Sequence, residues 1–207
     1  MADVALRRAD RDLPGLTVLA LLMTGPRHTY EMHRMMIDTH KDFVTGLPRS
    51  MYHSVERLLR DEHIVVADTI RDGSRPERIV YALTDAGRAE LVARVRRLLE
   101  TPDPDATLLV AGLSFVACLP PTEAAAALRA RRDALAGRCT ELERVLAETP
   151  VPRMLLLEVE YELARAASER DWLGTIVADL DSGQLDWPED VAELTALAGP
   201  DPEAPLS

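Results

Sequence analysis

The first part of the chain contains three successive stretches with helical patterning of apolar residues. Residues 15–24 are almost entirely apolar and lie between Pro14 and the pair Gly25-Pro26. This arrangement predicts a short buried helix that a Gly-Pro breaker ends. Methionines recur at near-helical spacing within 29–40, which predicts a second, amphipathic helix. A third helix is predicted over 48–62, because the proline at its start suits the first helical position.

The third predicted helix separates its apolar and polar residues onto opposite faces. Met51, Val55 and Leu58 follow the spacing i, i+4 and i+7, so these side chains are expected to face the core. The opposite face is predicted to be short, polar and basic, and its members are Ser50, His53, Ser54 and Arg57. A helix of this kind packs through one face and leaves hydrogen-bond donors free on the other.

After the third helix the pattern becomes strand-like. Residues 64–71 and 78–84 are rich in β-branched side chains, and the six residues between them include glycine and proline, which predicts a β-hairpin. A Thr-Asp pair at 84–85 can cap a fourth helix that continues to about Leu99. Three helices followed by a hairpin form a winged helix-turn-helix, in which the third helix enters the major groove of DNA.

The second half of the chain is predicted to be helical. Prolines and aspartates at 101–105 indicate a linker, and helices are expected over 106–119, 122–148 and 152–181. The predicted fold class is therefore mainly α with a small β-hairpin wing. The predicted domains are an N-terminal arm (1–12), a winged helix DNA-binding domain (13–100), the linker (101–105), a helical dimerisation and effector domain (106–198) and a disordered tail (199–207).

The last predicted helix carries apolar residues at positions typical of a helix that pairs with another helix. These residues, which we expect at a homodimer interface, are Leu156, Val159, Leu163, Leu173, Val177 and Leu180. Trp172 and Trp187 lie in the same predicted domain. They are expected either to anchor the dimer core or to form the walls of an apolar effector pocket.

Composition and charge exclude several classes of protein. Of the 207 residues, 47% are hydrophobic, which is enough for a globular core. The apolar run at 16–23, which only Thr17 interrupts, falls far short of the ~20 residues that a bilayer span requires, so we expect no membrane partner and a cytoplasmic location. Residues 1–100 hold 16 basic and 15 acidic side chains, whereas 101–207 hold 8 and 20. The near-neutral first half is therefore the better candidate for approaching a polyanion.

The polar face of the third predicted helix has the donors that contact base edges in the major groove. Ser50, His53 and Arg57 supply hydroxyl, imidazole and guanidinium groups. Further arginines can neutralise phosphates, namely Arg49, Arg60, Arg71, Arg75 and Arg78. A plain solvated helix face is the alternative for the same residues, and the hairpin that follows them favours DNA contact.

No motif of a common enzyme class or cofactor site occurs in the sequence. The chain lacks G-x-S-x-G, P-loop, G-x-G-x-x-G and H-E-x-x-H patterns. Cys118 and Cys139 lie 21 positions apart without metal-ligand spacing, and His33 and His40 lack further ligands to complete a metal site. We therefore expect no catalytic residue, no metal and no cofactor.

Three sequence motifs follow one another in the first half of the chain. Residues 18–32 read as an apolar helix, Gly-Pro and then His-Thr-Tyr-Glu-Met, and 47–59 contain Ser-Met-Tyr near the start of the third predicted helix. Residues 81–88, Tyr-Ala-Leu-Thr-Asp-Ala-Gly-Arg, follow the hairpin. Over about residues 13–92 the chain resembles the PadR family of transcriptional regulators, whose patterns are His-Gly-Tyr-Glu-Leu, Ser-Leu-Tyr and a similar wing-exit signature.

The resemblance implies a homodimeric repressor that a small hydrophobic or aromatic effector releases from a pseudo-palindromic operator in double-stranded DNA. It also implies that Tyr30 and Tyr52 contact phosphates, that Arg49 and Ser50 begin the recognition helix, and that the wing arginines bind the DNA backbone. The competing function is a winged-helix dimer that acts as a protein-interaction or structural module without a specific operator.

Two positions depart from the family pattern. Thr29 stands where the family has glycine, which bears on how closely the second helix approaches phosphate. The pair Glu62-His63 stands in place of Glu-Gly. A non-glycine residue is therefore expected in the left-handed conformation at the end of the third helix.

Overall fold

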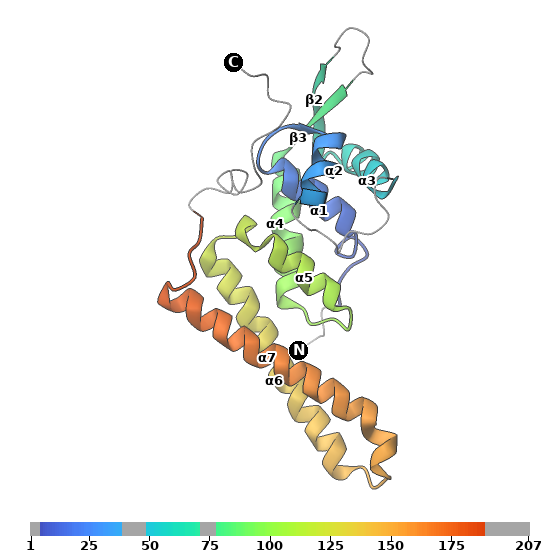
Figure 1. Ribbon diagram of the computed structural model, residues 1–207, viewed down its shortest axis with the longest axis vertical. Helices are drawn as coiled ribbons and strands as arrows, with labels where there is room; N and C mark the ends of the chain where they lie inside the picture. Colours follow the sequence, from blue (N-terminus) through green and yellow to red (C-terminus); the bar gives the residue numbers. More distant parts are fainter. Residues whose placement is uncertain (1–4, 39–48, 71–77, 189–207) are drawn as a thin grey trace.

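The computed structural model describes residues 5–38, 49–70 and 78–188, and its elements follow the predicted order (Figure 1). The helices are α1 (Leu13–Leu22), α2 (Thr29–Asp38), α3 (Arg49–Arg60), α4 (Asp85–Glu100), α5 (Ala106–Ser114), α6 (Pro121–Glu148) and α7 (Leu157–Ser182), with short 3-10 turns η1 (Val116–Cys118) and η2 (Arg153–Leu156). The strands are β1 (Arg27–His28), β2 (Ile64–Ile70) and β3 (Arg78–Leu83). The predicted fold class is confirmed. Within the described ranges, no helix has the length and apolar character needed to cross a bilayer.

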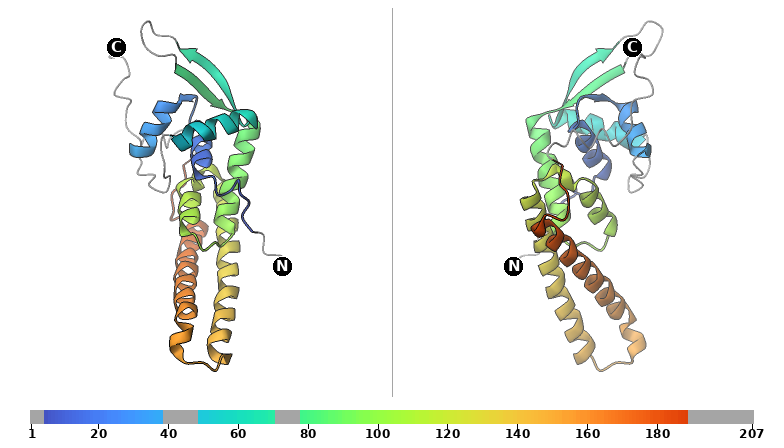
Figure 2. Two further views of the ribbon diagram at one scale, coloured as in Figure 1. Left: turned by 90° about the vertical axis from the view of Figure 1, so that its right-hand side faces the viewer. Right: turned by 60° about the vertical axis from the view of Figure 1, so that its left-hand side comes forward.

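The winged-helix part and a long helical hairpin lie at opposite ends of an elongated molecule (Figures 1 and 2). The sheet and the helices α1 to α3 gather at one end. α6 and α7 run antiparallel and project away from them, and α4 leads from the sheet toward this hairpin. The segment at 101–105 joins α4 to α5, and α4 packs on both α5 and α6.

α1 is apolar on every side and lies at the centre of the winged-helix core. Leu16, Val18 and Leu19 are fully buried, as expected of a helix that is hydrophobic all round. The helix begins two residues before its predicted start because Asp12 caps it. The Asp12 carboxylate accepts a hydrogen bond from the Gly15 backbone N–H at 3.3 Å.

Three antiparallel strands form the wing in the order β1–β3–β2. β1 is missing from the sequence prediction, because its two residues are too few to show a period. They pair with Tyr81 and Val80 of β3. The tip of the wing, with the predicted phosphate contacts Arg71 and Arg75, lies outside the described residues.

The junction between α3 and β2 is tight and has a left-handed residue at its turn. Glu62 has a φ of +58°, so a non-glycine residue is left-handed here, but it lies one position before His63, which stands where the family has glycine. Thr84 closes the junction from the other side: its hydroxyl donates to the Glu62 carbonyl oxygen at 2.8 Å and accepts from the Gly87 N–H at 2.9 Å. The first turn of α4 is therefore fastened directly to the end of α3.

A buried arginine fastens the end of α4 to the helical hairpin. Arg131 of α6 donates from Nη1 to the carbonyl oxygens of Leu98 and Thr101, at 3.1 and 2.6 Å. Its Nε donates to Glu169 Oε1 of α7 at 2.6 Å. The charge can be buried because it is paired and hydrogen-bonded, and the cation also suits the carbonyl end of α4.

Two of the predicted C-terminal helices are shorter in the structure. The helix predicted over 106–119 ends at Ser114, and the one predicted from 152 begins as η2 before α7 starts at Leu157. Gly183 ends α7 with a φ of +70°, a conformation that suits glycine after a helix. The predicted tail at 199–207 lies outside the described residues.

Candidate nucleic-acid interface

α3 presents one face to the core and another to solvent, as its sequence pattern predicts. Met51, Val55 and Leu58 are buried, which confirms the predicted apolar face. On the other side, four side chains are exposed: Tyr52, His53, Glu56 and Arg60. These four residues are called the exposed face of α3 below.

Glu56 and Arg60 extend this face beyond the predicted base contacts. Glu56 is absent from the sequence prediction, and Arg60 is present there only as a phosphate contact. Both follow from His53 at i+3 and i+7, so a helical wheel centred on His53 finds them. Glu56 Oε2 lies 3.7 Å from His53 Nδ1. A carboxylate can accept from cytosine N4 and a guanidinium can donate to guanine O6 and N7, so this face can read base edges.

Ser54 is buried, with 2% of its surface exposed, and its predicted place on the polar face is wrong. Its hydroxyl lies 3.5 Å from Asp12 Oδ1. The buried part of α3 is wider than its apolar residues indicate, because the beginning of α1 packs against this flank of the helix.

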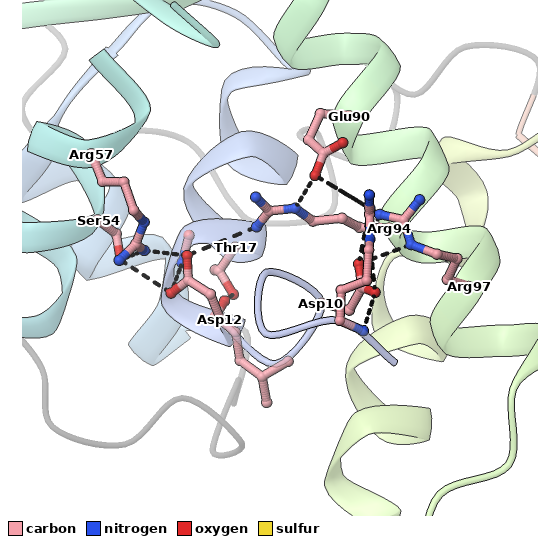
Figure 3. Close-up of polar contacts among 11 residues, drawn as sticks. Asp10, Asp12, Thr17, Ser54, Arg57, Glu90, Arg94 and Arg97 are labelled. Carbon is pink, nitrogen blue, oxygen red and sulfur yellow. Dashed lines mark hydrogen bonds and ion pairs between the residues drawn. The ribbon is translucent and has the colours of Figure 1, made fainter. Parts of the chain in front are cut away.

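Arg57 interacts with Asp12 and Ser54 on the same flank of α3. Its Nη2 pairs with the Asp12 carboxylate and donates to Ser54 Oγ at 3.2 Å (Figure 3). The side chain is 42% exposed, so it lies at the edge of the exposed face of α3. Base contact by Arg57 stays a prediction, and it requires the guanidinium to leave Asp12.

A buried tyrosine of the wing lies beneath the exposed face of α3. Burial raises the pKa of Tyr81, and the neighbouring Tyr52 and Glu56 raise it further. Its hydroxyl therefore stays protonated at physiological pH, within hydrogen-bonding reach of Thr29. Because these residues come from α2, α3 and β3, the three elements meet at this point.

The first turn of α2 exposes Tyr30, a predicted phosphate contact. The His28 N–H donates to Glu31 Oε2 at 3.2 Å, and the Glu31 N–H donates to His28 Nδ1 at 3.1 Å. This reciprocal cap holds the turn in place. The Tyr30 ring stacks on His28 with centroids 6.1 Å apart and is 63% exposed. Its hydroxyl is thus available to a phosphate beside a helix N-terminus.

The other predicted DNA contacts stay predictions. Arg49 and Arg78 begin α3 and β3, but their side chains lie outside the described part of the structure. Arg71 and Arg75 lie outside it entirely. Ser50 is half-buried near the start of α3 and already takes part in an interaction.

The predicted dimer interface on α7 divides into buried and exposed residues. Leu173 and Val177 are buried against α6 of the same chain, so the prediction is corrected for these two: they pack within the chain and not against a partner. Four other predicted residues are partly buried: Leu156, Val159, Leu163 and Leu180. Large exposed apolar side chains instead gather near the turn between α6 and α7, here called the hairpin patch: Val151, Met154, Leu155, Leu157 and Tyr161.

The two tryptophans lie in different surroundings. Trp187 packs on the core and donates its indole N–H to the Leu119 carbonyl oxygen at 3.1 Å. Trp172 is 43% exposed on α7. A cavity of about 410 Å³ lies between α6, α7 and residues 102–104, and neither indole lines it. The predicted pocket residues are therefore separate from this cavity.

The cavity combines an apolar wall with arginines. The apolar wall includes Leu135 and Leu142. Arg131 and Arg138 also line the cavity, and each pairs with a glutamate of α7 at 2.6 Å. Arg165, the third lining arginine, has no carboxylate partner among the described residues. The third carboxylate of the lining, Asp103, pairs with Arg11, so within the described ranges the cavity offers one arginine without a carboxylate partner beside apolar side chains.

The described residues show no metal site. Within 5–38, 49–70 and 78–188, no group of three or more His, Cys, Asp or Glu side chains is placed to hold a metal ion. Burial raises the pKa of the Cys118 thiol to about 11, so this thiol stays protonated and is a weak nucleophile.

Comparison with known proteins identifies a family that the first half of the chain resembles. The model of the "Transcriptional regulator PadR-like family" matches residues 18–93. This range spans all three sequence motifs, so the match confirms the resemblance drawn from them. Similar solved structures include Bacillus subtilis PadR in complex with operator DNA (21% identity, 80% of this chain and 98% of that chain, TM-score 0.39). Others are smu.1604c from Streptococcus mutans UA159 (19%, 79% and 98%, TM-score 0.38) and Bacillus subtilis PadR in complex with p-coumaric acid (19%, 82% and 99%, TM-score 0.33). No curated protein matches the chain in sequence.

Proposed function

Residues 18–93 belong to the PadR-like family of transcriptional regulators, and on that premise we propose that the chain binds a pseudo-palindromic operator as a homodimer and represses transcription until a small effector binds. The exposed face of α3 carries this proposal. Its carboxylate, imidazole and guanidinium groups suit base edges, while Tyr30 and the wing arginines would contact phosphates and set the register.

The charge distribution favours the winged-helix part as the DNA-binding surface. The net charge of −11 per chain opposes DNA at long range, but the acidic excess lies beyond residue 100. The Debye length is about 8 Å at physiological salt, so acidic groups on the distant helical hairpin act little on the exposed face of α3. Affinity for DNA should fall steeply as salt rises, because binding releases counterions.

The hairpin patch supports pairing with a second copy of this chain. Met154 and Tyr161 are 73% and 69% exposed, and neighbouring exposed apolar side chains mark interaction sites. The patch lies at the end of the molecule opposite α3 (Figure 1). Twofold pairing through the helical hairpins would present two α3 helices to major-groove segments about 34 Å apart, one turn of DNA.

The experiment that tests the proposal is selection of bound fragments from the source genome by the full chain at physiological salt. A regulator of this kind should enrich fragments that share one pseudo-palindrome with half-sites about one DNA turn apart. A winged-helix dimer that acts through protein contacts alone would enrich no common sequence, and that result would contradict the proposal.

Arg60→Ala is expected to weaken operator binding about 10-fold and to relax the preference at one base pair, because a bidentate guanine contact contributes ~1–3 kcal/mol of discrimination. Titration of operator variants measures both effects. The matched control is Arg132→Ala on α6, which removes the same charge far from α3 and should leave affinity unchanged. An equal loss on every sequence would make Arg60 a phosphate contact, and unchanged affinity would remove it from the interface.

The proposed effector site is the cavity between α6, α7 and residues 102–104. Its volume suits a small hydrophobic or aromatic molecule, and Arg165 would pair with an anionic group on that molecule. A ligand there would touch the segment that joins α4 to α5. The ligand would act by binding one arrangement of the winged-helix part and the helical hairpin more tightly than another.

Arg165→Ala is expected to abolish the stabilisation of the chain by small aromatic or aliphatic carboxylates. A ligand at 100 times its Kd adds about 2.7 kcal/mol to the free energy of unfolding, which should raise Tm by roughly 5–10 °C for a chain of this size. Arg170→Ala, which removes an arginine of α7 outside the cavity lining, is the control and should keep the full shift. If no carboxylate of a broad panel raises the Tm of the unaltered chain, the cavity is not the effector site.

A further inference from the structure

The Asp12 carboxylate lies between two arginines from different helices (Figure 3). Arg57 of α3 pairs with it directly, and Arg94 Nη1 of α4 lies 3.8 Å from Asp12 Oδ2. The same carboxylate caps α1 through the Gly15 N–H. Asp12 is thus held at the beginning of α1, where its carboxylate can pair with the arginine of α3 or with that of α4.

The second arginine has an unused donor directed at this site. Arg94 is buried, with 5% of its surface exposed, and its Nε donates to Glu90 Oε1 at 2.8 Å. Among the described residues its Nη1 is buried and donates no hydrogen bond. A buried donor without a partner is unfavourable, so a small movement of the Asp12 carboxylate toward Arg94 would satisfy it. Arg94 can therefore take over the carboxylate when Arg57 leaves.

We propose that Asp12 is a specificity-determining residue that positions Arg57, holding its guanidinium away from phosphates of non-operator DNA and releasing it at the operator, where Arg94 takes over the carboxylate. The proposal rests on the proposed operator-binding function. Asp12 itself need not touch DNA, since it acts through Arg57.

The exchange separates operator from other DNA because the two offer different acceptors. A lone phosphate replaces one ion pair of Arg57 with another, and little is gained. A guanine edge offers two aligned acceptors to a guanidinium. Arg57 therefore stays with Asp12 on non-operator DNA and transfers to a base edge where the operator presents one.

Asp12→Asn tests the proposal, because asparagine keeps the helix cap but removes the charge. On non-operator DNA, the variant should bind up to about 5-fold more tightly, the upper range for a half-exposed ion pair. For this variant, the slope of log K against log salt concentration should also become more negative by about one, as expected for one further phosphate contact. Operator affinity should change less than 2-fold, so the ratio of the two affinities falls.

Two controls separate this role from a merely structural one. Asp133→Asn on α6 makes the same change of charge and also frees a neighbouring arginine, and it should alter neither the ratio nor the slope. In an Arg57→Gln background, Asp12→Asn should have no effect on either quantity, because the two residues act through one contact. If Asp12→Asn unfolds the chain, Asp12→Ser keeps a capping side chain and repeats the measurement.

The outcomes distinguish this inference from the proposed function. If the unaltered chain prefers an operator but the folded Asp12 variants keep its affinity ratio and salt slope, the specificity role of Asp12 is overturned while operator binding stands. If the unaltered chain prefers no sequence at all, operator binding itself fails. An effect of Asp12→Asn that persists in the Arg57→Gln background also overturns the proposal.

Discussion

Gly87→Ala is expected to lower the free energy of unfolding by about 3 kcal/mol, the upper range for overpacking, because the new methyl group would meet the backbone. A Cβ atom at this position would overlap the carbonyl oxygen of His63 and lie 2.9 Å from its carbonyl carbon. It would also lie 2.8 Å from Leu83 Cδ1. The backbone at His63 cannot move aside easily, because it follows the left-handed Glu62 and accepts from the Thr84 N–H at 3.1 Å.

Thermal and urea unfolding of Gly87→Ala measure this effect, with an expected decrease in Tm of roughly 6–12 °C for a chain of this size. Gly137→Ala on α6 is the matched control, because a Cβ there meets no atom within 4 Å. Alanine in a helix interior is more favourable than glycine by about 0.5–1 kcal/mol, so the control should be slightly more stable than the unaltered chain. A Gly87→Ala chain that melts like the unaltered one would show that α4 does not approach His63 this closely.

Leu157→Glu combined with Tyr161→Glu is expected to give a monomer. Its operator affinity should be at least about 100-fold lower, because a monomer loses the linkage between two half-sites. The two residues lie one helical turn apart on α7, and both are at least half exposed. Carboxylates at these positions would be buried unpaired in an apolar dimer interface, yet they should leave the fold of the single chain intact. Sedimentation equilibrium and operator titration measure the two effects.

Val110→Glu is the control for this double variant, because Val110 is 49% exposed on α5, outside the hairpin patch. It should leave both the dimer and the operator affinity unchanged. A double variant that still sediments as a dimer would place the dimer interface elsewhere. A double variant that is monomeric but binds the operator as tightly as before would show that a single α3 suffices.

The order of the elements and the faces of α3 could be predicted because both depend on residues close together in the chain. Met51, Val55 and Leu58 share a face through helical geometry alone. A left-handed residue at the end of α3 could be predicted from the family pattern, but that pattern places it at His63, whereas the structure has it at Glu62. β1 could not, because two residues become a strand only by pairing with β3.

The partner of Arg57 could not be predicted, since Asp12 lies 45 positions earlier in the chain. Ser54 is polar and follows the exposed His53, and only the approach of α1 makes it a buried residue. The apolar spacing of α7 correctly indicates a packed face. It does not indicate which helix covers that face, and α6 of the same chain covers Leu173 and Val177.

By itself, the sequence determined the order of helices and strands, the buried side of α3 and the motifs of a PadR-like regulator, because period and motif are properties of neighbouring residues. Only the tertiary structure decided that Asp12 holds Arg57, that Ser54 is buried, and that Arg165 lines a cavity without a carboxylate partner in the described part of the chain. These features depend on which distant segments pack together. A local pattern shows that a face is buried or exposed, but it does not identify the surface that meets it.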